Sequence, residues 1–122
     1  MIVPGKGSAT QEGDVEIAEA TVRCLLAHVP SDVPGIVFLS GGMSDVEATN
    51  RLNEMNRIAA SRGGLPWALS FSYGRALQAP SLKAWGGDPA NVGAGQAALA
   101  HRASMNGLAR NGEYDPSMEP AA

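Results

Sequence analysis

Two glycine-rich turns hold the residues of this sequence whose types and spacing suit chemistry. Ser40-Gly41-Gly42 follows directly after one apolar run, and Ser72-Tyr73-Gly74-Arg75 follows directly after a second one. Each pattern is typical of a buried strand that ends in a small polar turn and leads into a helix. Exposed backbone N–H groups at two such turns, with one arginine close by, are the donors that a phosphate group requires. The two turns therefore predict a phosphate-binding site.

Each turn also has a simpler interpretation when it is taken alone. Tight turns use glycine widely, so Ser40-Gly41-Gly42 can be a plain strand-ending turn. Arg75 can be a solvent-exposed residue at the start of a helix. Lys6 lies in a Pro-Gly-Lys-Gly segment, but its spacing lacks the first glycine of a nucleotide-binding P-loop. The phosphate interpretation rests on the occurrence of both turns together.

Composition excludes several classes of function. The chain has 122 residues, which fits one small domain, and a net charge of -3 that gives no broad attraction for nucleic acid or anionic lipid. Cys24 is the single cysteine, and His28 and His101 have no metal-ligand spacing to it. No apolar stretch approaches the roughly 18 residues of a membrane span. We expect a cytoplasmic protein with no metal, no cofactor, and no nucleic-acid or membrane partner.

The elements that would carry the two turns alternate between helix and strand. Ser44 with Glu47 three residues later predicts a capping box at the start of the helix that follows the first turn. The apolar spacing predicts helices over Asp14 to His28, Ser44 to Ala60, Arg75 to Trp85 and Asp88 to Arg110. Continuous apolar runs predict strands at about 35–40 and 67–72.

This alternation is typical of an α/β fold with a parallel sheet. Because the carboxyl ends of parallel strands meet at one edge, we expect the two glycine turns to converge there. Two strands are too few for an independent sheet, so we expect a portion of a larger fold with one strand edge open. Residues 115–122 carry Pro116 and Pro120, and we expect them to form a flexible tail.

Longer segments around the turns carry a resemblance to a known family. They are Val33 to Gly42, Pro66 to Gln78, Leu82 to Gly87 and Ala103 to Ala109, ahead of Tyr114. These segments resemble class I fructose-bisphosphate aldolases, in which the first two match the seventh and eighth strands of a (β/α)₈ TIM barrel. Such a barrel needs about 250 residues. The resemblance implies that residues 1–114 are a partial barrel, its C-terminal portion, and that the chain is a fragment.

The resemblance also implies an activity. Class I aldolases are glycolytic lyases that reversibly cleave fructose 1,6-bisphosphate into dihydroxyacetone phosphate and glyceraldehyde 3-phosphate through a lysine imine (a Schiff base), without a metal. By resemblance, the substrate phosphate is bound by Ser40, Gly41, Gly42, Ser72, Gly74 and Arg75. The family's imine lysine would precede Met1, so we expect no catalytic residue in this chain and no activity of the chain alone. The full-length family implies a homo-oligomer, a tetramer.

Three interpretations of function stay open at this point. The chain is an aldolase by descent, a sugar-phosphate-binding module without chemistry, or a half-barrel that must pair with a partner fragment or a second copy. The presence or absence of the imine lysine distinguishes the enzymatic interpretation from the two non-enzymatic ones. The ending Met118-Glu119-Pro120-Ala121-Ala122 lacks the extension and terminal tyrosine of animal aldolases, so no role for such a tyrosine is implied.

Overall fold

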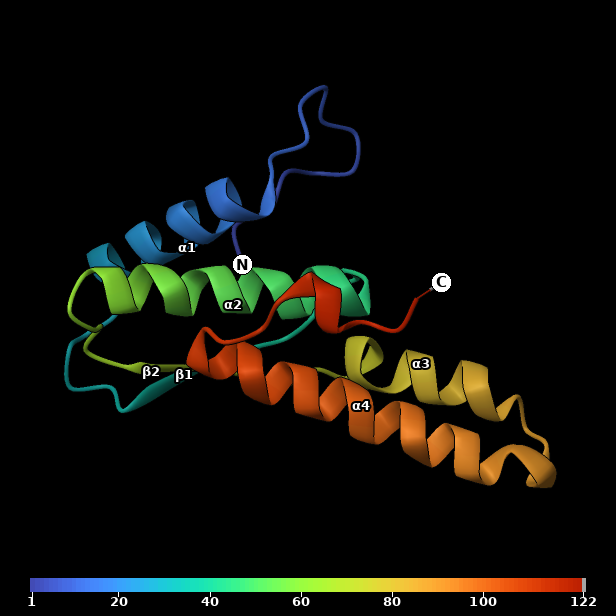
Figure 1. The fold of residues 1–122 in the computed structure, drawn as a ribbon. Coiled ribbons are helices and arrows are strands. Elements are labelled where there is room, and N and C mark those ends of the chain that lie inside the picture. The colour runs from blue at the N-terminus through green and yellow to red at the C-terminus, as the bar shows by residue number, and fades with distance from the viewer. Residues whose placement is uncertain (122) are drawn as a thin grey trace.

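The two apolar segments form neighbouring parallel strands, as predicted. In the computed structural model, which describes residues 1–121, strand β1 (Gly35–Phe38) pairs with β2 (Ala68–Phe71). Just beyond the last pair, the N–H of Ser72 donates to the carbonyl of Phe38 at 2.8 Å. Helix α2 (Asp45–Ser61) connects the two strands, so both strands end at the same edge (Figure 1).

Helix α2 begins with the capping box that the sequence predicts. The N–H of Glu47 donates to Ser44 Oγ at 3.2 Å, and the N–H of Ser44 donates to the Glu47 carboxylate at 2.9 Å. These two bonds satisfy donors that a helix start otherwise leaves free. Along the same helix Ala48, Leu52 and Met55 have no exposed surface, because this face of α2 packs into the core.

Three further helices pack around α2 and the sheet. Figure 1 shows one helix along one side of α2 and an antiparallel pair on the other side. They are α1 (Asp14–His28), α3 (Arg75–Trp85) and α4 (Val92–Asn111), with short 3₁₀ turns η1 (Pro89–Asn91) and η2 (Pro116–Met118). Within residues 1–121, none of these helices combines the length and apolar character needed to cross a bilayer.

The element boundaries depart from the predictions at the strands and at the last helix. The strands predicted at 35–40 and 67–72 are shorter, 35–38 and 68–71. The first strand ends early because the N–H of Met43 donates to the Ser40 carbonyl at 2.9 Å, which turns the chain out of the sheet. The last helix begins at Val92, because the Pro89 segment forms the separate turn η1. Two strands do not close a barrel, so the partial barrel over residues 1–114 stays an expectation.

The segment after Tyr114, which we expected to be a flexible tail, makes defined contacts. Tyr114 has no exposed surface, and the carboxylate of Glu119 lies 2.8 Å from Arg102 of α4. Figure 1 shows this segment returning along α2 and α4. The sequence did not predict these contacts. The flexibility of residues 115–122 stays a prediction, and residue 122 lies outside the described residues.

One face of the sheet is left without a covering helix. Val37 is 62% exposed and Leu39 is 69% exposed, whereas Phe38 between them is 6% exposed. Side chains alternate along a strand, so Val37 and Leu39 point away from the helices while Phe38 enters the core. Within residues 1–121, β1 also pairs only with β2 and keeps one edge open. Apolar faces and open edges of this kind favour association.

We predict that the 122-residue polypeptide, purified by itself, self-associates through this face. Replacing Val37 and Leu39 with Lys places like charges on the face and shifts the polypeptide toward monomer in sedimentation-velocity measurements. Val15→Lys is the control, because Val15 is comparably exposed (48%) but lies on α1. A wild-type monomer with a sharp two-state thermal transition would contradict the prediction.

Candidate functional site

The first glycine turn joins β1 to α2. It is closed by the bond from the Met43 N–H to the Ser40 carbonyl, and both central residues are left-handed, with φ of 56° at Gly41 and 86° at Gly42. Only glycine adopts two such conformations in succession at low cost. Ser40 is buried (4% exposed), whereas Gly41 and Gly42 are exposed. The turn therefore presents bare backbone to its surroundings.

The second turn joins β2 to α3 and is tied to α2. The carbonyl of Gly74, the N-cap residue of α3, accepts the N–H groups of Leu77 and Gln78 at 3.1 and 3.0 Å. The buried Tyr73 donates its hydroxyl to the carbonyl of Ala48 in α2 at 2.7 Å. Burial raises the pKa of Tyr73, so the hydroxyl keeps its proton and remains a donor. The turn after β2 is thus bonded to the helix that starts at the first turn.

Arg75 brings the two turns together. Its Nη2 atom lies 3.9 Å from the position that a Cβ on Gly42 would occupy. Arg75 is exposed, and within residues 1–121 no carboxylate pairs with its guanidinium. The sequence-predicted convergence of the turns is therefore seen at this contact. A Cβ at position 42 would be in ordinary van der Waals contact with the guanidinium, so the left-handed φ of Gly42, and not lack of space, is what favours glycine here.

Within residues 1–121, both turns hold backbone donors that make no hydrogen bond. The first N–H groups of a helix have no partner within the helix. In the described chain, the N–H groups of Gly41, Gly42, Gly74 and Arg75 donate to no acceptor. The N-terminus of α3 adds a positive partial charge. Donors and positive charge without a paired carboxylate suit a phosphate oxyanion.

A cleft of about 400 Å³ opens beside the first turn. Gly41 and Gly42 line it together with Lys6, which comes from the segment before α1. Arg51 also lines the cleft, but its guanidinium is paired with Asp14 at 2.9 Å. Sequence reasoning considered Lys6 as a P-loop residue and as a substitute imine lysine, rejected both roles, and missed its place beside the glycine turn. No local pattern signals that place, because it depends on how the N-terminal segment folds back.

The six sequence-predicted site residues lie at one edge of the sheet. Three follow β1 and three follow β2, and the two strands are direct neighbours. They are Ser40, Gly41, Gly42, Ser72, Gly74 and Arg75. Phosphate binding by these residues stays a prediction. The chemistry that the arrangement supports is binding of an anion, since it holds donors and no general base.

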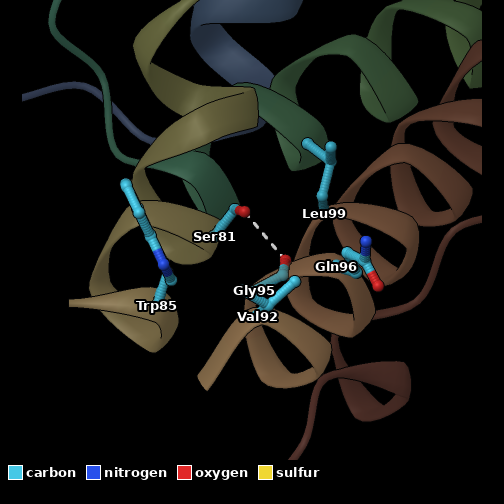
Figure 2. Close-up of a pocket in the computed structure, with 6 residues that line it drawn as sticks. All are labelled: Ser81, Trp85, Val92, Gly95, Gln96 and Leu99. Atoms are coloured by element: carbon cyan, nitrogen blue, oxygen red, sulfur yellow. Dashed lines mark hydrogen bonds between the residues drawn. The ribbon is translucent and has the colours of Figure 1, made fainter. Parts of the chain in front are cut away.

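A second pocket, of about 220 Å³, lies between α3 and α4 (Figure 2). Trp85, Val92 and Leu99 give it an apolar lining. The Ser81 hydroxyl donates to the Gly95 carbonyl at 2.8 Å across the two helices. A Cβ at Gly95 would lie only 3.0 Å from that of Trp85, so glycine permits this close packing. The pocket has no charged lining residue and does not suit a phosphate.

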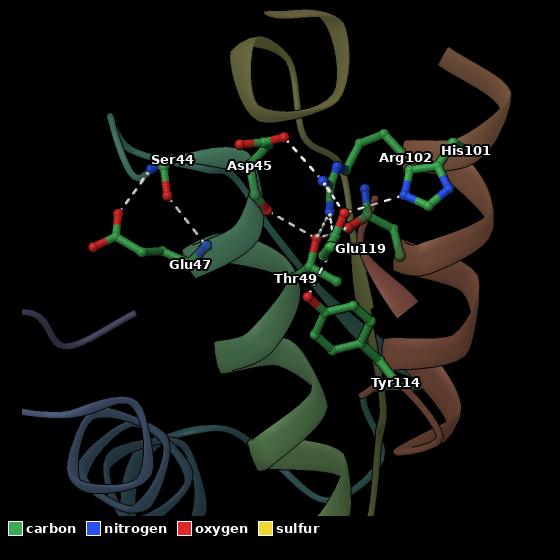
Figure 3. Close-up of polar contacts among 9 residues, drawn as sticks. Ser44, Asp45, Glu47, Thr49, His101, Arg102, Tyr114 and Glu119 are labelled. Carbon is green, nitrogen blue, oxygen red and sulfur yellow. Dashed lines mark hydrogen bonds and ion pairs between the residues drawn. The ribbon is translucent and has the colours of Figure 1, made fainter. Parts of the chain in front are cut away.

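A buried ion-pair cluster connects α2, α4 and the C-terminal segment (Figure 3). The Arg102 side chain on α4 is only 4% exposed, and its Nη2 atom lies 2.9 Å from the Asp45 carboxylate at the start of α2. Its Nη1 atom donates to Glu119 at 2.8 Å and to the Thr49 hydroxyl at 3.2 Å. Sequence reasoning missed these residues. The only available signal was that Arg102 shares a helix face with Met105.

Several donors converge on the Glu119 carboxylate. Both terminal nitrogens of Arg102 contact it, the Tyr114 hydroxyl donates to it at 2.9 Å, and His101 Nε2 lies 3.1 Å away. Burial by itself raises the pKa of Glu119, but the hydrogen bonds from Arg102, His101 and Tyr114 outweigh it and hold the pKa below its ordinary value. Burial and the bond to Glu119 raise the pKa of Tyr114 to about 12, so its hydroxyl remains a donor.

Comparison with known proteins identifies the family of the chain. Residues 1–122 match the family model described as glycolytic fructose-bisphosphate aldolase class-I. The chain belongs to the class I fructose-bisphosphate aldolase family. It is 50% identical over 117 residues to the non-muscle type fructose-bisphosphate aldolase of Lethenteron camtschaticum, an alignment that covers 96% of the chain and 31% of the relative. It is 48% identical to the probable class 1 aldolase of Xanthomonas campestris, covering 93% of the chain and 33% of that relative.

A solved aldolase structure is similar in fold as well. The aldolase of Plasmodium falciparum, solved in complex with TRAP and a small-molecule inhibitor, superposes with a TM-score of 0.85 at 43% sequence identity. The match covers 91% of this chain and 31% of the Plasmodium chain. The chain therefore spans about a third of the length of the relatives it matches.

We predict that protonation of Glu119 loosens the C-terminal segment. Its pKa is depressed in the folded state, so its contribution to stability is complete above the ordinary value of 4.5 and is lost as the pH falls through the lower folded-state value. Hydrogen-exchange protection factors of residues 112–121, which correct for the slower intrinsic exchange in acid, should therefore fall more steeply with decreasing pH in the wild type than in a Glu119→Gln variant that lacks this titration. The exposed Glu113→Gln is the control. Equal acid dependence in the two variants would contradict the prediction.

Proposed function

We propose that this chain forms the phosphate-binding part of a class I aldolase that acts on fructose 1,6-bisphosphate and its triose phosphate products. The observation that carries the proposal is the position of Arg75 Nη2, 3.9 Å from where a Cβ on Gly42 would stand. A guanidinium at a glycine turn with free N–H groups is a cradle for a doubly charged phosphate. Because the chain belongs to the aldolase family, we infer that this phosphate is part of a sugar phosphate.

Two carboxylates, those of Glu12 and Glu47, line the same cleft as Gly42, and Glu47 is committed to other partners. The Glu47 carboxylate accepts the N–H of Ser44 and lies 3.5 Å from Arg51. The Ser44 N–H is the main reason why the pKa of Glu47 lies below its ordinary value, so this charge is committed to the capping box. The Gly41 and Gly42 N–H groups are left to meet the phosphate oxygens. Arg75 adds charge-assisted hydrogen bonds from the other turn.

We further propose that these 122 residues bind substrate but do not form the imine. The lysines of the chain are Lys6 and Lys83. An imine requires a neutral amine, which burial or a neighbouring cation favours. Lys6 and Lys83 are both exposed, Lys6 in the N-terminal segment and Lys83 on α3. Cleavage through a lysine imine then requires a lysine outside this sequence, and the sites here supply affinity and orientation.

The uncovered face of β1 favours a second candidate function. Val37 and Leu39 are the apolar side chains that another set of strands or helices would cover. A sugar-phosphate-binding half-barrel that needs a partner fragment accounts for this face without requiring any chemistry. In both functions we propose a cytoplasmic homo-oligomer, a tetramer as in the full-length family, although one relative from Chlamydomonas reinhardtii is chloroplastic.

We predict that Arg75→Ala weakens phosphate binding. In the full natural polypeptide that carries residues 1–122, the loss should be about 1.5–3 kcal/mol, the scale of a hydrogen bond to a charged group. Calorimetric titration with inorganic phosphate and with fructose 1,6-bisphosphate measures the loss. Arg62→Ala is the matched control, because Arg62 is exposed at the other end of α2. Unchanged affinity of the Arg75 variant would remove the main support for the proposal.

We also predict that the 122-residue polypeptide forms no imine with substrate. Incubation with dihydroxyacetone phosphate and borohydride should leave its mass unchanged, because Lys6 and Lys83 are both exposed. A complete class I aldolase treated in parallel should gain the mass of the reduced adduct. An adduct on Lys6 or Lys83, located by peptide mass spectrometry, would overturn the assignment of a purely binding role.

A further inference from the structure

The Arg102 cluster ends at the helix turn that follows the phosphate cradle. Arg102 Nη2 lies 2.9 Å from the carboxylate of Asp45, which is the first residue of α2. Figure 3 shows Asp45 and Arg102 pointing toward each other, with the capping box of Ser44 on the neighbouring side of the same helix start. Only Met43 and Ser44 separate Asp45 from Gly42 along the chain. The guanidinium therefore holds the chain immediately beyond the glycine turn.

A movement of the start of α2 would also move the glycine turn, because both residues between them, Met43 and Ser44, have hydrogen-bonded N–H groups. The Met43 N–H donates to the Ser40 carbonyl at 2.9 Å, and the Ser44 N–H donates to Glu47 at 2.9 Å. The backbone between Gly42 and Asp45 therefore has little conformational freedom. A displacement of the helix start by as little as 1 Å would move the Gly41 and Gly42 N–H groups, and misplacement on that scale is costly at a binding site.

Arg102 also fixes the C-terminal segment. Its two terminal nitrogens hold the Glu119 carboxylate at 2.8 and 2.9 Å, a bidentate pair with a defined geometry. The same guanidinium thus has one carboxylate on α2 and one on the segment after η2. Both carboxylate side chains are mostly buried, 28% exposed at Asp45 and 16% at Glu119, so bulk solvent screens the pair only in part.

The cluster is better suited to setting positions than to adding stability. Burial of the guanidinium and two carboxylates carries a desolvation cost that often cancels the attraction. Within residues 1–121, Arg102 Nε and Asn106 Nδ2 are buried without a hydrogen-bond partner, which adds to this cost. The cluster does fix the relative positions of α2, α4 and the C-terminal segment, because a bidentate pair specifies both the distance and the orientation of its two groups.

We propose that Arg102 is a positioning residue for the phosphate cradle, and that it couples the placement of the C-terminal segment, through Glu119, to the affinity of the Gly41-Gly42 turn for phosphate. The proposal rests on the proposed function. In this arrangement, release of Glu119 removes the bidentate pair that fixes the orientation of the guanidinium, so the ion pair with Asp45 loosens and the start of α2 relaxes together with the turn before it.

Two conservative variants separate positioning from simple electrostatics. Arg102→Lys keeps the positive charge but cannot hold two carboxylates with a planar fork. Glu119→Gln removes a negative charge, which by electrostatics alone should strengthen the binding of an anion. The proposal predicts that both variants weaken the binding of inorganic phosphate about three- to tenfold, the usual range for coupling through a network. Arg110→Met is the matched control, an exposed arginine on the same helix.

The affinities are measured by calorimetric titration of the full natural polypeptide that carries residues 1–122, at a temperature where circular dichroism shows each variant folded. Hydrogen exchange of the Met43 N–H, which bonds to Ser40, is measured in the same samples without phosphate. Faster exchange in Arg102→Lys and Glu119→Gln, but not in Arg110→Met, supports the positioning role. Wild-type exchange in both variants overturns it, as does wild-type or tighter phosphate binding.

The two readouts also distinguish this proposal from the proposed function. If the wild type binds neither inorganic phosphate nor fructose 1,6-bisphosphate, the proposed function fails, and exchange at Met43 still decides whether Arg102 positions the turn. If the wild type binds phosphate and the two variants match it in affinity and exchange, the proposed function stands and the positioning role fails.

Discussion

The parallel pairing of β1 with β2 is the interaction on which the candidate site depends. The pairing places Phe38 beside Phe71, and the Ser72 N–H bonded to the Phe38 carbonyl extends it to the point where the second turn begins. A slip of one residue would carry Phe38 out of the core. The same slip would move the glycine turn by about 3.3 Å relative to Arg75, which is enough to separate the two turns.

Helix α2 connects the paired strands to the rest of the fold. Its first turn is held from the β2 side by the Tyr73 hydroxyl on the Ala48 carbonyl, and from the α4 side by Arg102 on Asp45. The capping box of Ser44 closes the start of the helix between these two attachments. The exposed glycine turn therefore owes its shape to buried contacts on both sides of it.

The features that the sequence predicted are those that local pattern determines. The capping box, the two glycine turns and the parallel strands depend on residues within a few positions of one another or on apolar runs. The first strand was predicted two residues too long, because apolar Leu39 continues the run but lies on the uncovered face. The contact of Arg102 with Glu119 spans 17 residues and depends on how the C-terminal segment returns to α4, so no local pattern contains it. An arginine among apolar helix positions is usually solvated, which hid its burial.

The most direct test of the central claim is a crystal structure of the full natural polypeptide that carries residues 1–122, determined with fructose 1,6-bisphosphate bound. The account predicts one phosphate group within hydrogen-bond distance of the Gly42 N–H and of Arg75 Nη2, with the left-handed turn at Gly41 and Gly42 unchanged. A bound sugar phosphate whose two phosphate groups both lie away from this turn, with Arg75 directed elsewhere, would contradict it.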